Sequence, residues 1–165
     1  MNAGAMGAQT FENVVRVRYL DGEGNSHTKN RDELDVRYRN FPLLENNFAI
    51  SATFRGHSAL RNEIERRLEE SQEKRRTSQP IAKSAGCIFK NTDRIPAGKL
   101  VDELGLKNAR VGKARVSEVH GNFIVNDGGA TATDMLELIE KIKTAAREKR
   151  GIDLETEVQI VGEPI

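Results

Sequence analysis

Hydrophobic and polar residues alternate in the first third of the chain, which is the pattern of strands with one buried face. The alternation runs from Val15 to Leu20, and the turn residues "DGEGN" follow it, which is typical of a β-hairpin. A second run, "FAISATF", places four side chains on one strand face: Phe48, Ile50, Ala52 and Phe54. We therefore predict a small, mostly antiparallel sheet over residues 12–55.

The pattern changes to that of a helix from His57 to Arg76. Leu60, Ile64 and Leu68 recur every four residues among charged residues, which predicts a connecting helix with one buried edge. Pro80 then closes the segment. The basic "EKRR" end is favoured by the helix dipole alone, so it does not require a nucleic-acid partner.

The rest of the chain, from about Lys83, has the pattern of an α+β domain. The segment "TATDMLELIEKIKTAAREKRG" predicts a helix that Thr131 and Asp134 cap and Gly151 ends. Its predicted core stripe consists of Met135, Ile139, Ile142 and Ala146. We predict strands at "NFIVN" and "TEVQIVG" and a shorter helix near Ala97 to Glu103.

Composition narrows the kind of partner. The 26 Lys and Arg nearly cancel the 25 Asp and Glu, so no global field attracts nucleic acid or anionic lipid. No uninterrupted apolar run approaches the ~18 residues that cross a bilayer, and nothing resembles a signal peptide. One cysteine cannot form an internal disulfide. We expect a cytoplasmic protein that binds neither nucleic acid nor membrane.

The single cysteine, Cys87, lies in "KSAGCIFKN" after a run of small residues that lets a ligand or another backbone come close. A buried, unreactive thiol that fills space is one interpretation. The other is a proton donor with a reference pKa near ~8.5, whose thiolate Lys83 or Lys90 stabilises. The local sequence leaves both open.

Two further residues have the same two interpretations. Arg39 lies in an irregular connection between two predicted strands. It is either a solvated loop residue or a bidentate hydrogen-bond donor to a carboxylate. Glu157 either belongs to a polar outer strand face or takes part in the chemistry. His120 has no second histidine or cysteine at metal-ligand spacing, so we expect no metal site. The motifs of serine hydrolases, P-loop proteins and Rossmann proteins are also missing from the sequence.

Several separate motifs resemble those of the UDP-N-acetylenolpyruvoylglucosamine reductase family, in the family's order. They are "MNAGAMG", "YR" at Tyr38 and Arg39, "ISATFR", "SAGCIFKN", "AGKLVDELGLK", "VSEVHGNFIVN" and "LETEVQIVG". The resemblance spans essentially the whole chain. It implies a flavoenzyme of peptidoglycan synthesis that uses FAD and NADPH to reduce UDP-N-acetylglucosamine enolpyruvate to UDP-N-acetylmuramate.

The resemblance also implies a domain organisation. The family's region before "NAGA" supplies the cradle for the flavin diphosphate, whereas here Met1 opens on that motif. The chain therefore resembles the family's carboxyl-terminal part: the end of a flavin-binding α+β domain at 1–56, a connecting helix at 57–80 and a small α+β substrate-binding domain at 81–165. The missing flavin region is a possible partner in trans. The alternative is a non-catalytic UDP-sugar-binding fragment that lacks flavin.

Site residues follow from the same resemblance. Cys87 stands where the family usually has the serine that protonates the enolic intermediate, and Arg39 with Glu157 would stabilise charge on that intermediate. By the same resemblance, the residues that contact the flavin are expected to be Asn2, Ala3, Gly4 and Ala5. The residues of the nucleotide-sugar pocket are expected to be Lys83, Asn91, Ser117 and His120. Phe41 replaces a serine that is usual two residues after the arginine, so the support of Arg39 must differ here.

Overall fold

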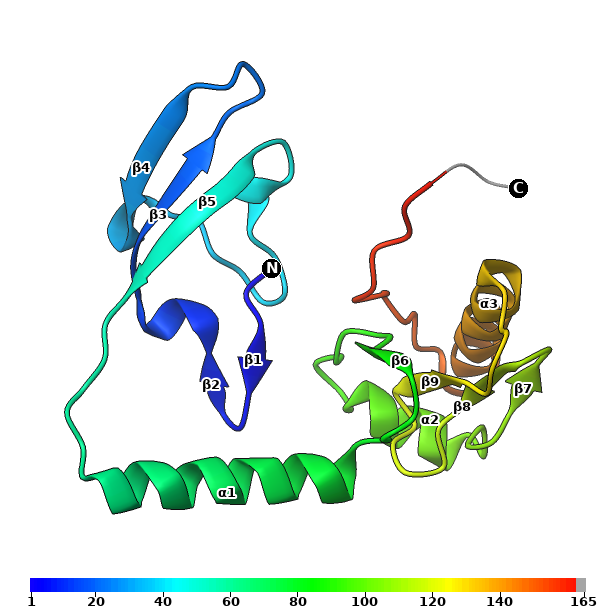
Figure 1. The fold of residues 1–165 in the computed structure, drawn as a ribbon. Coiled ribbons are helices and arrows are strands. Elements are labelled where there is room, and N and C mark those ends of the chain that lie inside the picture. The colour runs from blue at the N-terminus through cyan, green and yellow to red at the C-terminus, as the bar shows by residue number, and fades with distance from the viewer. Residues whose placement is uncertain (163–165) are drawn as a thin grey trace. The chain divides into compact units, whose positions relative to one another are not determined.

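The computed structural model describes residues 1–162 and confirms a mixture of helices and sheets of the α+β class. The chain divides into two compact units, Met1–Leu68 and Glu69–Ile165, each with its own hydrophobic core (Figure 1). The division falls within helix α1 (Arg61–Ser78), where the sequence predicts a connecting helix. None of the helices in the described part combines the length and the hydrophobicity needed to cross a bilayer.

The first unit contains a three-stranded antiparallel sheet in the order β4-β3-β5, which confirms the predicted sheet. Its strands are β3 (Val14–Leu20), β4 (Ser26–Asn30) and β5 (Phe48–Phe54). A small hairpin of β1 (Gly4–Ala5) and β2 (Ala8–Gln9) precedes it. Short 3-10 helices cover Thr10–Glu12, Arg31–Glu33 and Pro42–Leu44.

The core of this unit lies on β3 and on the loops around it, not on β5. Its buried members are Phe11, Val14, Val17, Leu34 and Phe41. The rings of Phe11 and Phe41 pack with their centroids 4.5 Å apart. This core needs Phe41 as an apolar residue, which explains why a small polar side chain is absent there.

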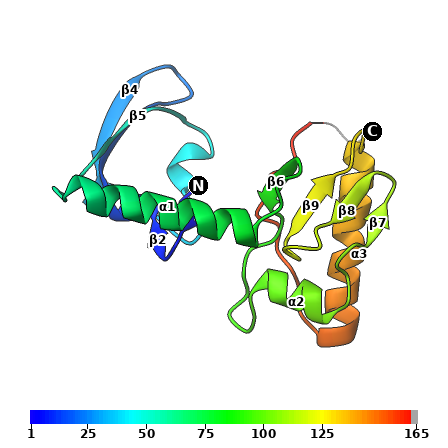
Figure 2. The same cartoon turned by 60° about the horizontal axis from the view of Figure 1, so that its bottom comes forward.

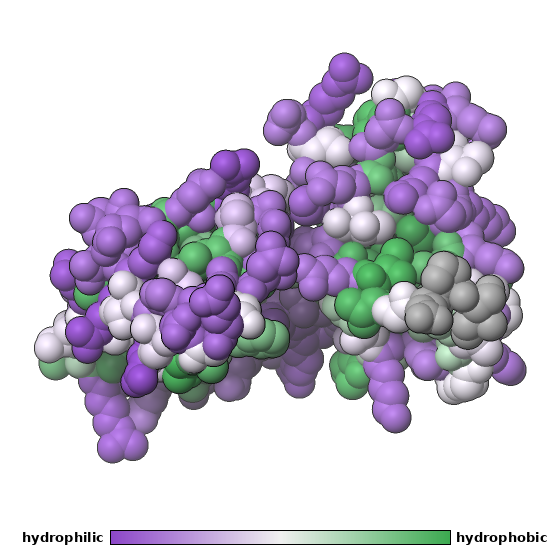
Figure 3. Space-filling model, turned by 90° about the horizontal axis from the view of Figure 1, so that it is seen from above, coloured by the Kyte–Doolittle hydropathy of each residue, from purple (hydrophilic) through white to green (hydrophobic). Residues whose placement is uncertain are grey.

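Two hydrophobic stripes of the sequence are exposed. β5 is an edge strand, and its side chains Phe48, Ile50 and Phe54 are 70%, 45% and 58% exposed. The predicted buried edge of α1 is wrong, because no residue of that helix is buried and its stripe is open to solvent. The core of this unit already closes without either stripe. Hydrophobic residues on the surface are visible in green in Figure 3.

The second unit is a four-stranded antiparallel sheet with a long helix across one face (Figure 2). The strand order is β6-β9-β8-β7, with β6 (Ser84–Cys87), β7 (Arg110–Val111), β8 (Ala114–Val116) and β9 (Phe123–Asn126). Helices α2 (Ala97–Glu103) and α3 (Ala132–Arg150) complete it. The predicted short helix and the predicted strand at "NFIVN" are confirmed.

The ends of α3 form as the sequence predicts. The Asp134 backbone N–H donates to Thr131 Oγ1 at 3.1 Å, and the Thr131 backbone N–H donates to the Asp134 carboxylate at 3.1 Å. Gly151 ends the helix in the left-handed conformation, with φ of 62°. Of the predicted stripe, Ile139, Ile142 and Ala146 are buried. Met135 is only half-buried, and Leu138 is fully buried in its place.

The predicted strand at "TEVQIVG" is wrong. Only an isolated bridge between Thr156 and Phe89 forms there. The backbone N–H groups of Glu157 and Val158 both approach the same carbonyl, that of Ile88, at 2.7 and 3.5 Å. Two successive donors on one acceptor cannot continue a ladder, so regular pairing ends after Thr156.

Thr131→Ala should lower the free energy of unfolding of the second unit by about 1 kcal/mol, because the helix loses the acceptor that satisfies the Asp134 N–H. The measurement is urea unfolding followed by circular dichroism. Thr133→Ala, an exposed position in the first turn of α3, is the matched control and should change stability little. Equal losses in both variants would contradict the capping role.

Candidate active site

Cys87 is the last residue of β6, at an irregular point of the sheet. The β6–β9 register shifts between Ser84 and Cys87. Gly86 has φ of +85°, a backbone conformation in which a residue with a side chain would be strained. Cys87 pairs with Phe123 and is half-buried. An irregularity of this kind re-aims a side chain relative to a regular strand.

A pocket of about 320 Å³ lies beside Cys87 within the second unit. Its wall comes from the end of β6, the loop after it, the start of α2 and the turn before β9. Three residues that the sequence predicts as functional line it together: Cys87, Asn91 and His120.

His120 is held in one orientation and one tautomer. Its Nδ1 accepts the Asn122 backbone N–H at 3.1 Å, so the neutral ring carries its proton on Nε2. Its ring packs edge-on against Phe123, with centroids 4.9 Å apart. Burial lowers the pKa of His120 below its ordinary value, and the positive charge of Lys107 lowers this pKa further. The ring is therefore a neutral hydrogen-bond donor at neutral pH.

Glycines make room for this ring. A Cβ on Gly98 would lie 2.7 Å from His120 Cε1, and a Cβ on Gly121 would lie 2.5 Å from the Gly98 carbonyl oxygen. No real Cβ makes contacts this short, so α2 approaches the turn closely only because both residues are glycine.

Asn122 binds the segment that follows Cys87, residues 88–90. Its Oδ1 accepts the Phe89 backbone N–H at 2.9 Å, and its Nδ2 donates to the Phe89 carbonyl at 2.8 Å. Its own carbonyl accepts the Ile88 N–H at 2.9 Å. Asn122 is buried and also lines the pocket.

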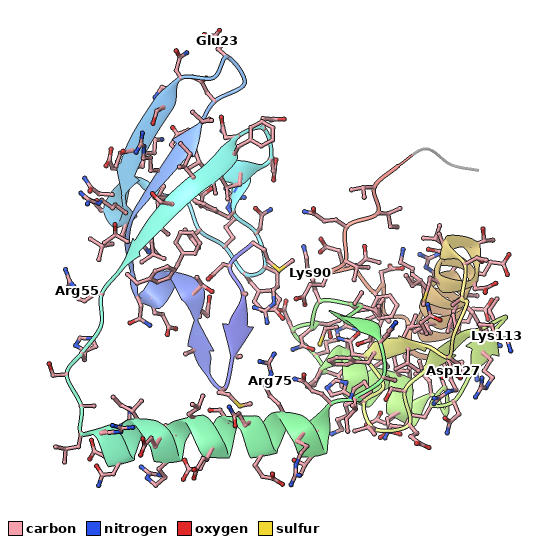
Figure 4. All side chains as sticks on the ribbon, in the orientation of Figure 1. Glu23, Arg55, Arg75, Lys90, Lys113 and Asp127 are labelled. Carbon is pink, nitrogen blue, oxygen red and sulfur yellow. The ribbon has the colours of Figure 1, made fainter. Side chains whose placement is uncertain are left out.

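The carboxyl-terminal segment runs along the other side of residues 88–90. The Glu157 N–H donates to the Ile88 carbonyl at 2.7 Å, which places Glu157 next to the residue that follows Cys87. Lys90 donates its backbone N–H to the Glu155 carbonyl, and its ammonium group pairs with the Glu155 carboxylate. Figure 4 labels Lys90 in the loop after β6. The charge of Lys90 is therefore directed to Glu155.

The other residues predicted for the sugar pocket have distinct surroundings. Ser117 is buried, and its hydroxyl accepts the N–H groups of Val119 and His120 at 3.1 and 3.3 Å. Lys83 is exposed, and its carbonyl accepts the Asn126 N–H. Asn91 Oδ1 accepts the Ala97 N–H at 3.0 Å at the start of α2. Within residues 1–162, the lining of the Cys87 pocket does not include Lys83, Ser117 or Glu157.

In the first unit, Arg39 lies against the segment that the sequence predicts to contact flavin. Its Nη1 and Nη2 donate to the carbonyls of Asn2 and Gly4 at 3.3 and 3.4 Å. Its guanidinium carbon lies 4.9 Å from the centroid of the Tyr38 ring. Arg39 has φ of 51°, which is uncommon for a residue other than glycine. Main-chain carbonyls and a ring thus hold Arg39, although residue 41 is a phenylalanine.

The sequence interpretation missed four polar residues of the pocket: Lys99, Asp102, Lys107 and Asn122. Lys107 forms a 2.9 Å ion pair with Asp102. The signals in the sequence were the motifs "AGKLVDELGLK" and "HGNF", which do not show where the side chains point.

At the far end of the same sheet, Asp127 binds Arg115 and Arg110, whose hydrogen bonds lower its pKa to about 2. Figure 4 labels Asp127 near Lys113, whose carbonyl accepts the Asp127 N–H at 3.0 Å. This pairing stabilises the turn between β7 and β8 and is remote from the pocket. In the described part of the chain, no group of three or more His, Cys, Asp or Glu side chains is arranged to hold a metal ion.

The second unit is a small α+β domain with a pocket lined by Cys87, His120, two asparagines and several charged residues. Residues 78–161 match the family model described as UDP-N-acetylenolpyruvoylglucosamine reductase, C-terminal domain. The chain belongs to the UDP-N-acetylenolpyruvoylglucosamine reductase family.

Individual relatives agree with this assignment. Reductases of this name from Lachnoclostridium phytofermentans and Geotalea uraniireducens are 39% and 42% identical over 100% and 98% of the chain. The chain spans about half the length of each of these relatives, 54%. The relative from Bacillus licheniformis is 40% identical, over 99% of the chain and 90% of that relative.

A solved structure has the same fold. The crystal structure of UDP-N-acetylenolpyruvylglucosamine reductase from Thermus caldophilus is 37% identical, with a TM-score of 0.85. The match covers 96% of this chain and 57% of that chain.

The lowered pKa of His120 predicts a stability loss in mild acid. The unfolded chain takes up a proton near the ordinary value of 6.5, while folded His120 takes it up only at lower pH. Stability should therefore fall as pH drops below about 6.5 and continue to fall until the folded pKa is reached. Urea unfolding at several pH values between about 5 and 7 measures this.

His120→Gln, which does not titrate, should remove that part of the pH dependence. Asp127 does not contribute to the slope between about pH 5 and 7, because the ordinary pKa of its carboxyl is 3.8 and the pKa in the folded protein is about 2. An unchanged slope in His120→Gln would contradict the assignment of the slope to His120.

Proposed function

We propose that this chain carries out, with bound flavin, the NADPH-dependent reduction of UDP-N-acetylglucosamine enolpyruvate to UDP-N-acetylmuramate in the cytoplasm. The observation that carries the proposal is the pocket that brings Cys87, Asn91 and His120 together in one wall. Membership of the reductase family supports a role in peptidoglycan synthesis.

In this proposal Cys87 is the acid. When bound, the reduced flavin supplies hydride to the enolpyruvyl double bond. The Cys87 Sγ–H then gives its proton to the neighbouring substrate carbon, and the thiolate remains. A thiol, with an ordinary pKa of ~8.5, is several units more acidic than a serine hydroxyl, so it suits this transfer.

Arg39 and Glu157 stabilise charge on the enolic intermediate in the same proposal. The guanidinium of Arg39 donates to the main-chain carbonyls of Asn2 and Gly4. A planar guanidinium suits a substrate carboxylate, because it presents two parallel donors. The Glu157 backbone is fixed to Ile88, next to the proposed acid.

The hairpin that contains Asn2, Ala3, Gly4 and Ala5 fits a role in holding FAD. Ala3 and Ala5 are exposed, and their small side chains leave the main chain open to a flat ring. Asn2 itself is buried and internally occupied, since its Nδ2 donates to Gln9 Oε1 at 2.5 Å and its Oδ1 accepts the Phe11 N–H at 3.3 Å. We infer that Asn2 shapes the hairpin while the residues after it contact the cofactor.

The nucleotide part of the substrate is proposed to bind at the Cys87 pocket. The Nε2–H of His120 is a neutral donor, and two cations line the pocket: Lys107, which is paired with Asp102, and Lys99, whose side chain is 67% exposed. Positive charge of this kind attracts a diphosphate. Ser117 supports His120 through the turn, and Lys83 remains a candidate for contacts at the exposed start of β6.

A second candidate function is a UDP-sugar-binding module without catalysis. The observation that favours it is that every lining residue of the Cys87 pocket belongs to the second unit, so this pocket forms without the flavin hairpin. The two candidates differ in whether the protein holds flavin and turns over substrate.

Cys87→Ser should retain measurable turnover in flavin-loaded protein, and Cys87→Ala should lose it by about a hundredfold or more, as expected for the loss of a general acid. The measurement is NADPH oxidation in the presence of UDP-N-acetylglucosamine enolpyruvate. Equal turnover in the wild type and in Cys87→Ala would sink the acid assignment.

The flavin-free chain should bind UDP-N-acetylglucosamine in calorimetry. His120→Ala should weaken that binding by about tenfold, the factor of one lost hydrogen bond to a charged or strongly polar group. His57→Ala, at an exposed histidine of the other unit, is the control and should bind as the wild type does. Absent binding in the wild type, or equal weakening in both variants, would count against the proposed pocket.

A further inference from the structure

Asn122 is the buried residue that connects the two chemically important side chains of the pocket. Its side chain and backbone make four hydrogen bonds, and it is 3% exposed. Asn122 lies within the motif "VSEVHGNFIVN", but the resemblance assigns site roles in that motif only to Ser117 and His120.

The side-chain amide of Asn122 fixes the backbone of the segment after Cys87. The Phe89 N–H must face an acceptor and the Phe89 carbonyl must face a donor, so the Asn122 amide fits in one orientation, with bonds of 2.9 and 2.8 Å. Phe89 is itself 1% exposed, so water does not replace these bonds. Cys87 lies two residues before Phe89, whose backbone N–H and carbonyl are both hydrogen-bonded to Asn122.

The backbone of the same residue acts on both sides of the pocket. Its N–H donates to His120 Nδ1 at 3.1 Å and so sets the tautomer of the ring. Its carbonyl accepts the Ile88 N–H at 2.9 Å, directly after Cys87. One residue therefore sets the position of the strand that carries the thiol and the orientation of the imidazole.

We propose that Asn122 is a positioning residue for this site. Its side-chain amide fixes the backbone of Phe89 and thereby keeps the Cys87 thiol at the pocket. Its backbone N–H keeps the Nε2–H of His120 oriented in the same pocket. The part of the proposal that concerns turnover rests on the proposed function. The positioning of the thiol does not.

The direct test measures the reactivity of Cys87 in the 165-residue chain, where it is the single cysteine. The probe is a dipyridyl disulfide, which reacts with thiols in acid as well as in base. Asn122→Ala should raise the rate by about tenfold over the wild type, since loss of buried hydrogen bonds favours local opening by such a factor. A rate within about twofold of the wild type overturns the proposal.

The control is Ile142→Ala, which removes packing from the core of the same unit without touching the pocket. It should leave the rate near that of the wild type under conditions where the protein is folded. The same increase in Ile142→Ala would show that Asn122 acts only through general stability, and this outcome also overturns the proposal.

Asn122→Asp gives a conservative rescue that depends on pH. The neutral carboxylic acid can accept from the Phe89 N–H and donate to its carbonyl, whereas the carboxylate cannot donate. The thiol reactivity, taken relative to the wild type at each pH, should be near one in acid and rise toward the Asn122→Ala value as the carboxyl ionises. A flat ratio overturns the proposal, and this variant carries the test if Asn122→Ala does not fold.

In flavin-loaded protein, Asn122→Ala should lower kcat by about tenfold or more and change KM by less than about threefold, because a misplaced acid affects the chemical step. If Cys87→Ala keeps full turnover, the proposed acid role of Cys87 fails while the reactivity assay still decides the positioning role. A change in KM alone would overturn the claim that Asn122 acts on the thiol in the reaction.

Discussion

The hydrogen bonding of the main chain from Ile88 to Lys90 is the constraint on which the site depends. The turn before β9 binds this segment on one side, where Asn122 engages Ile88 and Phe89. The carboxyl-terminal segment binds it on the other, where Glu157 donates to Ile88 and Glu155 accepts from Lys90. Buried backbone groups need partners, so this double pairing permits the segment to run through the interior.

The same segment joins the core to the pocket. Ile88 and Phe89 are 4% and 1% exposed and belong to the core that α3 covers. Cys87, immediately before them, is half-buried at the pocket. A residue next to two anchored core residues has little freedom of backbone movement, and close packing of the interior transmits that restraint. Catalytic groups need this kind of fixed position.

The sequence predicted those parts of the fold whose signals are local. The hairpin, the α2 helix and both ends of α3 follow from alternation, turn residues and caps within a few positions of each other. Two predictions were wrong: the burial of the apolar stripe of α1 and the strand at "TEVQIVG". Each of these features depends on a partner that is distant in the chain. Periodicity shows that a face is apolar, and it does not show what packs on that face.

The residues of the candidate site divide in the same way, into those that a local motif indicates and those whose contacts leave no local signal. Cys87, Asn91 and His120 were found from motifs, and the pocket brings them together. Asn122 and Phe89 are 33 positions apart, and a bond from a side chain to a distant peptide leaves no period in the sequence. The two carbonyl contacts of Arg39 were also unpredictable, since every residue carries a carbonyl group.

The neutrality of His120 has a chemical consequence for the proposed reaction. An imidazolium is a stronger acid than a thiol, so a charged His120 would compete with Cys87 to protonate a nearby carbanion. Burial and Lys107 both lower the pKa of His120, and the Asn122 N–H occupies Nδ1, which leaves the ring as a neutral donor through Nε2. In the proposed reaction, this environment separates two roles that the residue types alone do not separate: binding by the ring and supply of the proton by the thiol.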